Sequence, residues 1–186
     1  MSAFETRALD AQLSATDTGT LVGYAAVFNS RSHDLGGFRE VIRPGAFDRS
    51  LREFPDVLAL VEHDTNRVLA RTTNGSLRIT PDAHGLRVEI DPADVSWAKD
   101  IVTLVRRQDV RGMSFRFRPF PGGSVLDASG AEAVRTLTAV ELKEVSVVVD
   151  PAYPATSVSV RALHAAQQES ARHAMRAFRL RLAANE

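Results

Sequence analysis

The sequence contains no cysteine among its 186 residues. This absence excludes disulfides, thiolate zinc sites and cysteine nucleophiles, and it leaves serine as the side chain best suited to covalent catalysis. Lysine and arginine (23) balance aspartate and glutamate (23), so no overall charge draws the chain to nucleic acid or to an anionic membrane. We therefore expect local surface features to select the partners, and we expect neither nucleic acid nor membrane among them.

Long apolar runs are missing as well. No stretch approaches the roughly 20 residues that a membrane-spanning helix needs, and Glu5, Arg7 and Asp10 interrupt the N-terminus where a secretory signal would be apolar. Metal-binding histidine motifs and glycine-rich phosphate loops are also absent from the sequence. We therefore expect a soluble cytoplasmic protein that uses no metal and no cofactor.

Between Thr20 and Ser159, short apolar runs alternate with glycine, proline, asparagine and aspartate, which is typical of a strand-rich domain. So many short strands suit a barrel or a sandwich. The predicted strands cover residues 21–28, 38–42, 57–61, 67–71, 76–80, 86–90, 113–118, 134–140 and 145–149.

Helical spacing appears in three places. A short helix is predicted from Pro44, and a second over 95–108, where Trp97 and Ile101 lie on one apolar stripe. After Pro154, apolar residues recur every three or four positions and predict a long amphipathic C-terminal helix. Its arginine-rich face suits solvent, a second subunit or an acidic partner. The expected division is a flexible segment over 1–19, a β domain over 20–159 and a helix over 160–186.

Residues 111–118 alternate strictly, with Met113, Phe115 and Phe117 on one face of a strand and Ser114 on the other. A strand holds a serine hydroxyl firmly enough for nucleophilic catalysis. A serine on a polar strand face is, however, more often only solvated, so periodicity alone does not assign Ser114 a role.

His63 follows the apolar run 57–61 and precedes a turn at 64–66. Because histidine titrates near neutral pH, His63 is suited to take a serine proton and return it to a leaving amine. The structural alternative is a histidine that ends a strand and bonds to its own loop.

Glu144 lies in the apolar segment 140–149, where a carboxylate needs a partner. The catalytic interpretation is that Glu144 orients the His63 ring, and the structural one is an ion pair with Lys143 or Arg135. Ser146, on the same strand, is a rival nucleophile to Ser114.

Six segments, taken in order, resemble the prohead protease family of tailed bacteriophages, which is similar in fold to the herpesvirus assemblins. The resemblance covers roughly residues 23–155. The segments are GYAAVF at 23–28, EVIRPGAF at 40–47, LVEHD at 60–64, GLRV at 85–88, VRGMSFRF at 110–117 and LKEVSVV at 142–148.

The resemblance implies a β-rich α+β fold, with a closed, assemblin-like β-barrel ringed by helices, and a Ser-His-acid endopeptidase. Ser114 matches the family's nucleophile and His63 its general base. Glu144 matches as the third member, and Asp64 and Glu141 remain alternatives because assemblins use a second histidine there. For the oxyanion, backbone N–H groups near 145–149 are expected, with the Arg116 guanidinium as the alternative.

The resemblance also implies partners and a location. The substrates would be the major capsid protein with its scaffolding domain, together with the chain itself, cleaved before Thr20 or after Pro154. The enzyme would act as a dimer or oligomer in the host bacterial cytoplasm, inside the immature capsid. The competing interpretation is a catalytically idle capsid assembly or scaffolding protein with the same barrel.

Overall fold

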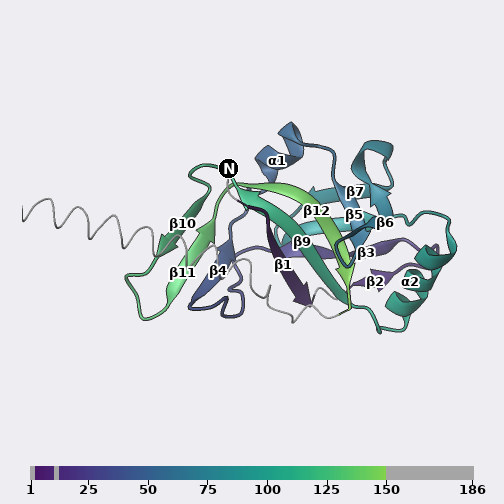
Figure 1. The fold of residues 1–186 in the computed structure, drawn as a ribbon, viewed down its shortest axis with the longest axis horizontal. Coiled ribbons are helices and arrows are strands. Elements are labelled where there is room, and N and C mark those ends of the chain that lie inside the picture. The colour runs from purple at the N-terminus through teal and green to yellow at the C-terminus, as the bar shows by residue number, and fades with distance from the viewer. Residues whose placement is uncertain (1–2, 11–12, 150–186) are drawn as a thin grey trace, which may run out of the picture. The chain divides into compact units, whose positions relative to one another are not determined.

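The computed structural model describes residues 3–10 and 13–149 of the chain (Figure 1). All of them belong to the first of two units, Met1–Pro154 and Ala155–Glu186. The helices are α1 (Asp48–Glu53) and α2 (Ser96–Arg106), with a 3₁₀ turn η1 (Thr72–Asn74). The strands are β1 (Glu5–Asp10), β2 (Ser14–Ala15), β3 (Leu21–Val27), β4 (Phe38–Ile42), β5 (Leu58–Val61), β6 (Asp64–Arg71), β7 (Leu77–Pro81), β8 (Gly85–Ile90), β9 (Gly112–Pro119), β10 (Ser124–Asp127), β11 (Ala133–Leu137) and β12 (Val140–Val148).

The described strands form three sheets rather than one ring. Their orders are β1-β9-β12-β5-β6, β2-β3-β8-β7 and β10-β11-β4. The predicted closed barrel ringed by helices is therefore wrong, although the β-rich class with helices holds. Alternation in the sequence indicates which face of a strand is buried, but it does not determine which strand edges pair. The predicted C-terminal helix over 160–186 and the boundary at residue 159 lie outside the described residues.

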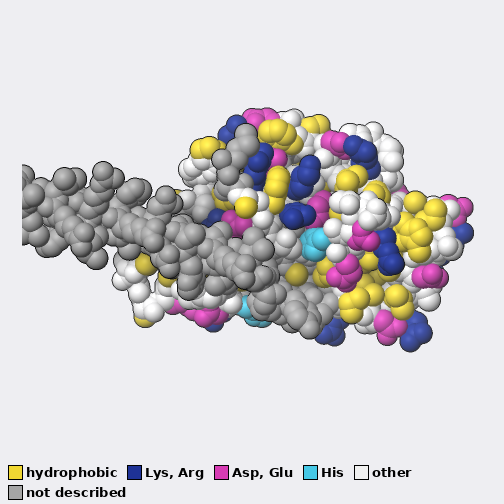
Figure 2. Space-filling view, in the orientation of Figure 1, with side chains coloured by type: hydrophobic (Ala, Val, Ile, Leu, Met, Phe, Trp, Pro, Cys, Tyr) yellow, Lys and Arg dark blue, Asp and Glu magenta, His cyan; other side chains and the backbone are white. Residues whose placement is uncertain are grey.

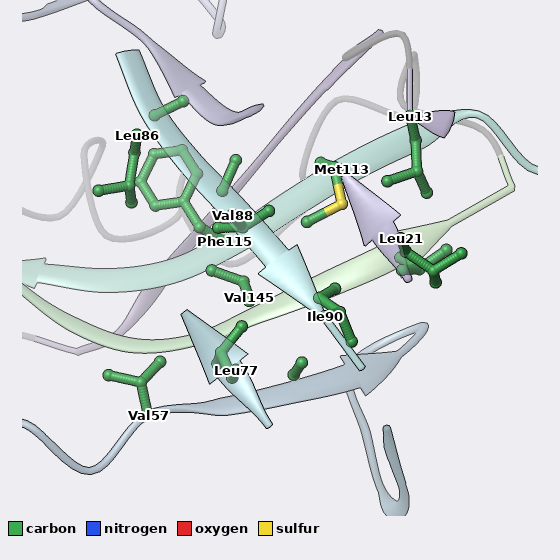
Figure 3. Packing of buried hydrophobic residues seen from close by; sticks show 14 of the residues in the cluster. Leu13, Leu21, Val57, Leu77, Leu86, Val88, Ile90, Met113, Phe115 and Val145 are labelled. Carbon is green, nitrogen blue, oxygen red and sulfur yellow. The ribbon is translucent and has the colours of Figure 1, made fainter. Parts of the chain in front are cut away.

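The five-stranded and four-stranded sheets contribute to one apolar cluster (Figure 3). Val88 of β8 lies in it together with Phe115 of β9 and Val145 of β12. Phe115 makes an edge-on contact with Phe47, with ring centroids 5.7 Å apart, and a tilted contact with Phe117 at 5.1 Å. Burial of one such side chain stabilises the fold by about 1.5–3 kcal/mol, so the apolar face of β9 anchors this strand against the second sheet.

The two helices agree with the prediction in position but differ at their starts. The first was predicted from Pro44, whereas residues 44–47 form turns and α1 begins at Asp48. Gly45 has a φ of 84°, in the left-handed region, which ends any continuous helix there. In α2, Ile101 and Val105 are buried, as the helical spacing predicted, whereas Trp97 is only partly buried and Ala98 lies in the core instead.

Residues before Thr20, expected to be a flexible segment, supply β1 and β2. Strand β1 pairs antiparallel with β9, with Glu5 opposite Phe117 and Ala8 opposite Ser114. The short run ETRALD carries little apolar periodicity, so the sequence shows no strand here. The N-terminal strand is thus an edge strand beside the one that carries Ser114.

A cluster of four charged side chains joins β1 to β4 and β11. Arg7 donates to the Glu40 carboxylate over 2.8 and 3.0 Å, and Arg135 donates to the Glu5 carboxylate over 2.6 and 2.8 Å. Arg135 also reaches Glu40, at 3.2 Å. Both Arg7 and Glu40 are buried, and the loss of one partner from a buried ion pair is costly because it leaves the other charge uncompensated. The cluster therefore fixes β1 in the fold.

Because of this cluster, we expect the free energy of unfolding to decrease in acid. Burial raises the pKa of the Glu5 carboxyl, but the hydrogen bonds and charges of Arg135 and Arg7 outweigh it and leave the pKa below its ordinary 4.5. The stabilisation is therefore complete above the ordinary pKa and is lost as the pH falls through the lowered one. Glu5→Gln should reduce the free energy of unfolding at neutral pH by about 1–3 kcal/mol and flatten its decline in acid, as measured by urea unfolding across pH.

Glu53→Gln is the matched control for this experiment, because Glu53 pairs with Arg49 on the exposed surface of α1. It should leave the acid dependence of the free energy of unfolding unchanged. If Glu5→Gln and the natural chain lose stability equally steeply in acid, the buried cluster contributes nothing to that dependence.

Candidate active site

His63 lies in the two-residue turn between β5 and β6. Val61 and Asp64 face each other across the hairpin, and Glu62 and His63 between them have φ values of 51° and 60°. Non-glycine residues seldom adopt positive φ, and such departures gather at functional sites. The His63 side chain is 25% exposed, so the turn presents the imidazole at the border between protein and solvent.

Ser114 lies on β9, on the face opposite the apolar cluster, as the alternation predicted. Met113, Phe115 and Phe117 belong to the cluster, whereas the Ser114 Oγ lies 2.7 Å from His63 Nε2. The hydroxyl is not on a solvated face, because Ser114 is fully buried. The structure therefore brings together the predicted nucleophile and base, which are 51 residues apart in the sequence.

A second acceptor lies beside the same hydroxyl. The Arg7 carbonyl oxygen of β1 is 2.9 Å from Ser114 Oγ. Since a hydroxyl has one proton, Ser114 donates either to this carbonyl or to an unprotonated His63 Nε2. The sequence offered no sign of the Arg7 contact, because it depends on the pairing of β1 with β9.

Glu144 reaches the site because of a β-bulge in β12. The register with β9 shifts between Leu142, opposite Phe117, and Glu144, opposite Arg116. In a regular strand without this bulge, Lys143 would lie opposite Arg116, and the Glu144 side chain would lie on the apolar face together with Leu142. The change in parity is visible in the sequence, because the inward apolar positions run 140 and 142 before the bulge and 145 and 147 after it.

The Glu144 Oε1 lies 2.5 Å from His63 Nδ1. Glu144 is buried, and a carboxylate in this position accepts the Nδ1–H, which leaves Nε2 free to accept a proton from Ser114. The two alternative acids are engaged elsewhere. Asp64 accepts from the backbone and side chain of Asn66, and Glu141 accepts from Arg118.

The rival nucleophile Ser146 has different partners. Its Oγ lies 2.7 Å from Glu144 Oε2 and 3.2 Å from the backbone nitrogen of His63. Both ring nitrogens of His63 are occupied by Ser114 and Glu144. Ser146 therefore contacts the site from the side of the carboxylate rather than as the partner of the imidazole.

The groups considered for the oxyanion are either exposed or already hydrogen-bonded. Arg116 is exposed on β9, two positions from Ser114. In the segment 145–149, the Val149 N–H donates to the Glu62 carboxylate over 2.6 Å, and residues 145–148 pair with β9. The assignment of the oxyanion donors stays a prediction.

The charges around the described unit are mixed. Basic and acidic side chains alternate over the visible face, apart from the area covered in grey (Figure 2).

Within residues 3–10 and 13–149, no three His, Cys, Asp or Glu side chains group as metal ligands. In the same part of the chain, no helix is long and apolar enough to cross a membrane.

A hydroxyl, an imidazole and a carboxylate hydrogen-bonded in that order form the arrangement used by serine hydrolases. The family model described as caudovirus prohead serine protease matches residues 2–171 of the chain. The chain therefore belongs to this family of phage serine proteases, in agreement with the resemblance found in the sequence. None of the curated proteins and none of the solved structures matches it.

Proposed function

We propose that this chain is an active serine endopeptidase with Ser114 as nucleophile, His63 as general base and Glu144 as the residue that orients the histidine. The observation that carries the proposal is the continuous row from Ser114 Oγ through both His63 nitrogens to Glu144 Oε1, with separations of 2.7 and 2.5 Å. These are hydrogen-bonding distances already suitable for proton transfer without substrate.

The reaction proceeds through an acyl-enzyme. His63 Nε2 takes the Ser114 proton while Oγ forms a bond to the scissile carbonyl carbon. The carbon–nitrogen bond then breaks, and the imidazolium gives its proton to the leaving amine. A water molecule, deprotonated by His63, attacks the ester and releases the second product, and Ser114 regains its proton. Throughout, the Glu144 carboxylate stabilises the protonated imidazole.

The family description supports capsid precursors as substrates. We propose that the enzyme removes the scaffolding parts of the major capsid protein, acting inside the immature capsid in the host cytoplasm as a dimer or oligomer. We also propose that it cleaves itself. Peptide bonds within β1 are protected by pairing with β9, which favours a cleavage site after Pro154 over one in residues 5–10.

Coexpression tests the substrate and the catalytic state together. The full chain is expressed with its cognate major capsid protein and scaffolding domain, and the products are identified by intact-mass measurement. A shortened capsid protein and labelling of the chain by a fluorophosphonate probe are expected. A full-length capsid protein and an unlabelled chain would instead indicate the idle assembly protein.

A further inference from the structure

Ser146 and Glu144 lie on the same face of β12, beyond the bulge. Ser146 is opposite Ser114 on β9 and opposite Leu60 on β5. It is fully buried, so its hydroxyl must find partners inside the protein. The strand therefore places a second hydroxyl directly behind the Glu144 carboxylate.

The direction of both Ser146 hydrogen bonds is determined by chemistry. The His63 backbone N–H can only donate, so Ser146 Oγ accepts it, at 3.2 Å. The single Ser146 proton is then given to Glu144 Oε2, at 2.7 Å. With His63 Nδ1 at Oε1, each oxygen of the carboxylate has its own donor, which fixes the plane of the carboxylate as well as its position.

The His63 backbone needs such a tie. Both residues of the turn have positive φ, as a two-residue hairpin turn requires, and in residues other than glycine this conformation costs free energy. Two hydrogen bonds to β12 support it, one from the Glu62 N–H to the Val147 carbonyl, at 3.0 Å, and one from the His63 N–H to Ser146. Ser146 is the residue that joins the strained turn and the carboxylate.

We infer that Ser146 is a positioning residue, which holds the Glu144 carboxylate and the backbone of His63 in register so that the imidazole faces Ser114. This inference rests on the proposed function. It gives Ser146 a role different from that of nucleophile, and it explains why a hydroxyl occupies a strand position that is otherwise flanked by Val145 and Val147.

The test uses the labelling rate of Ser114 by a fluorophosphonate, which requires no knowledge of the natural substrate. Ser146→Ala should lower the second-order rate constant about 10- to 100-fold, the value of one hydrogen bond to a charged group. Labelling at the rate of the natural chain would overturn the inference while leaving the proposed function intact. Labelling that persists in Ser114→Ala, with the adduct on Ser146, would overturn both.

Ser50→Ala is the matched control. Ser50 is also a buried serine whose Oγ accepts a backbone N–H of β12, that of Leu142, at 2.8 Å. In the interactions described, the Ser50 hydroxyl forms no hydrogen bond with Glu144 or with His63. A smaller loss in labelling than in Ser146→Ala is expected, and equal losses would mean that both variants only loosen β12.

A double-mutant cycle separates positioning through Glu144 from a merely structural effect. When Ser146→Ala is combined with Glu144→Gln, the loss in labelling rate should be much smaller than the product of the two single losses. The reason is that Glu144→Gln already removes the carboxylate that Ser146 holds in place. Losses that multiply to within about twofold would overturn the inference.

Discussion

Replacing Ser114 with alanine should lower peptide-bond cleavage by about 10⁶-fold, the loss measured when the nucleophile of a well-studied serine protease is removed. The alanine leaves His63 without a hydroxyl to deprotonate, and no acyl-enzyme forms. The capsid protein coexpressed with Ser114→Ala should keep its full mass, and the purified variant should not react with a fluorophosphonate.

The fold of this variant should be unaffected, because the Ser114 side chain lies outside the apolar cluster formed by its neighbours Met113 and Phe115. Ser129→Ala is the control, since the Ser129 hydroxyl donates only to Asp127, the last residue of β10, in the interactions described. Normal capsid processing by Ser114→Ala would exclude Ser114 as the nucleophile.

Exchanging Glu144 for glutamine should have the second-largest effect, a decrease in turnover of about 10⁴-fold. A glutamine amide can donate to His63 Nδ1, and this favours the tautomer with its proton on Nε2. That nitrogen then faces Ser114 as a donor and cannot accept the hydroxyl proton. The loss should appear in kcat, because the carboxylate acts on the reacting groups rather than on the bound substrate.

Glu141→Gln is the matched control for this substitution. Glu141 lies three residues earlier on β12 and accepts from Arg118 rather than from His63. Its exchange should leave turnover close to that of the natural chain. If Glu141→Gln or Asp64→Asn proved the more damaging change, the third role would pass to that acid.

The sequence predicted most strands of the described unit because their apolar residues alternate with polar ones. The run from Met113 to Phe117 shows this directly, since its inward residues are found in the core. The pairing of Ser114 with His63 came from a different source, the ordered family segments. The alternation of apolar and polar residues placed Ser114 on the correct face of β9. It could not show that a histidine 51 positions away lies within hydrogen-bonding distance.

Two features of the fold could not be predicted from the sequence, for physical reasons. Strand β1 depends on Arg7 meeting Glu40, a partner 33 positions away, rather than on its own periodicity. The way the strands divide among three sheets depends on edge pairing, which alternation does not encode. The bulge at Lys143, by contrast, leaves a change in apolar parity that the sequence shows, and this change indicates that Glu144 lies on the face of its strand opposite to the apolar residues.

The residues of the site lie far apart in the sequence, and this affects when the site can form. Arg7 and Ser114 are hydrogen-bonded although 107 positions separate them, and His63 and Glu144 although 81 positions separate them. Contacts so remote in sequence form late, since long loops must close before they contribute. A chain emerging from the ribosome has no complete catalytic row until β12 has been made and has inserted between β5 and β9. The proposed proteolysis therefore requires the finished domain.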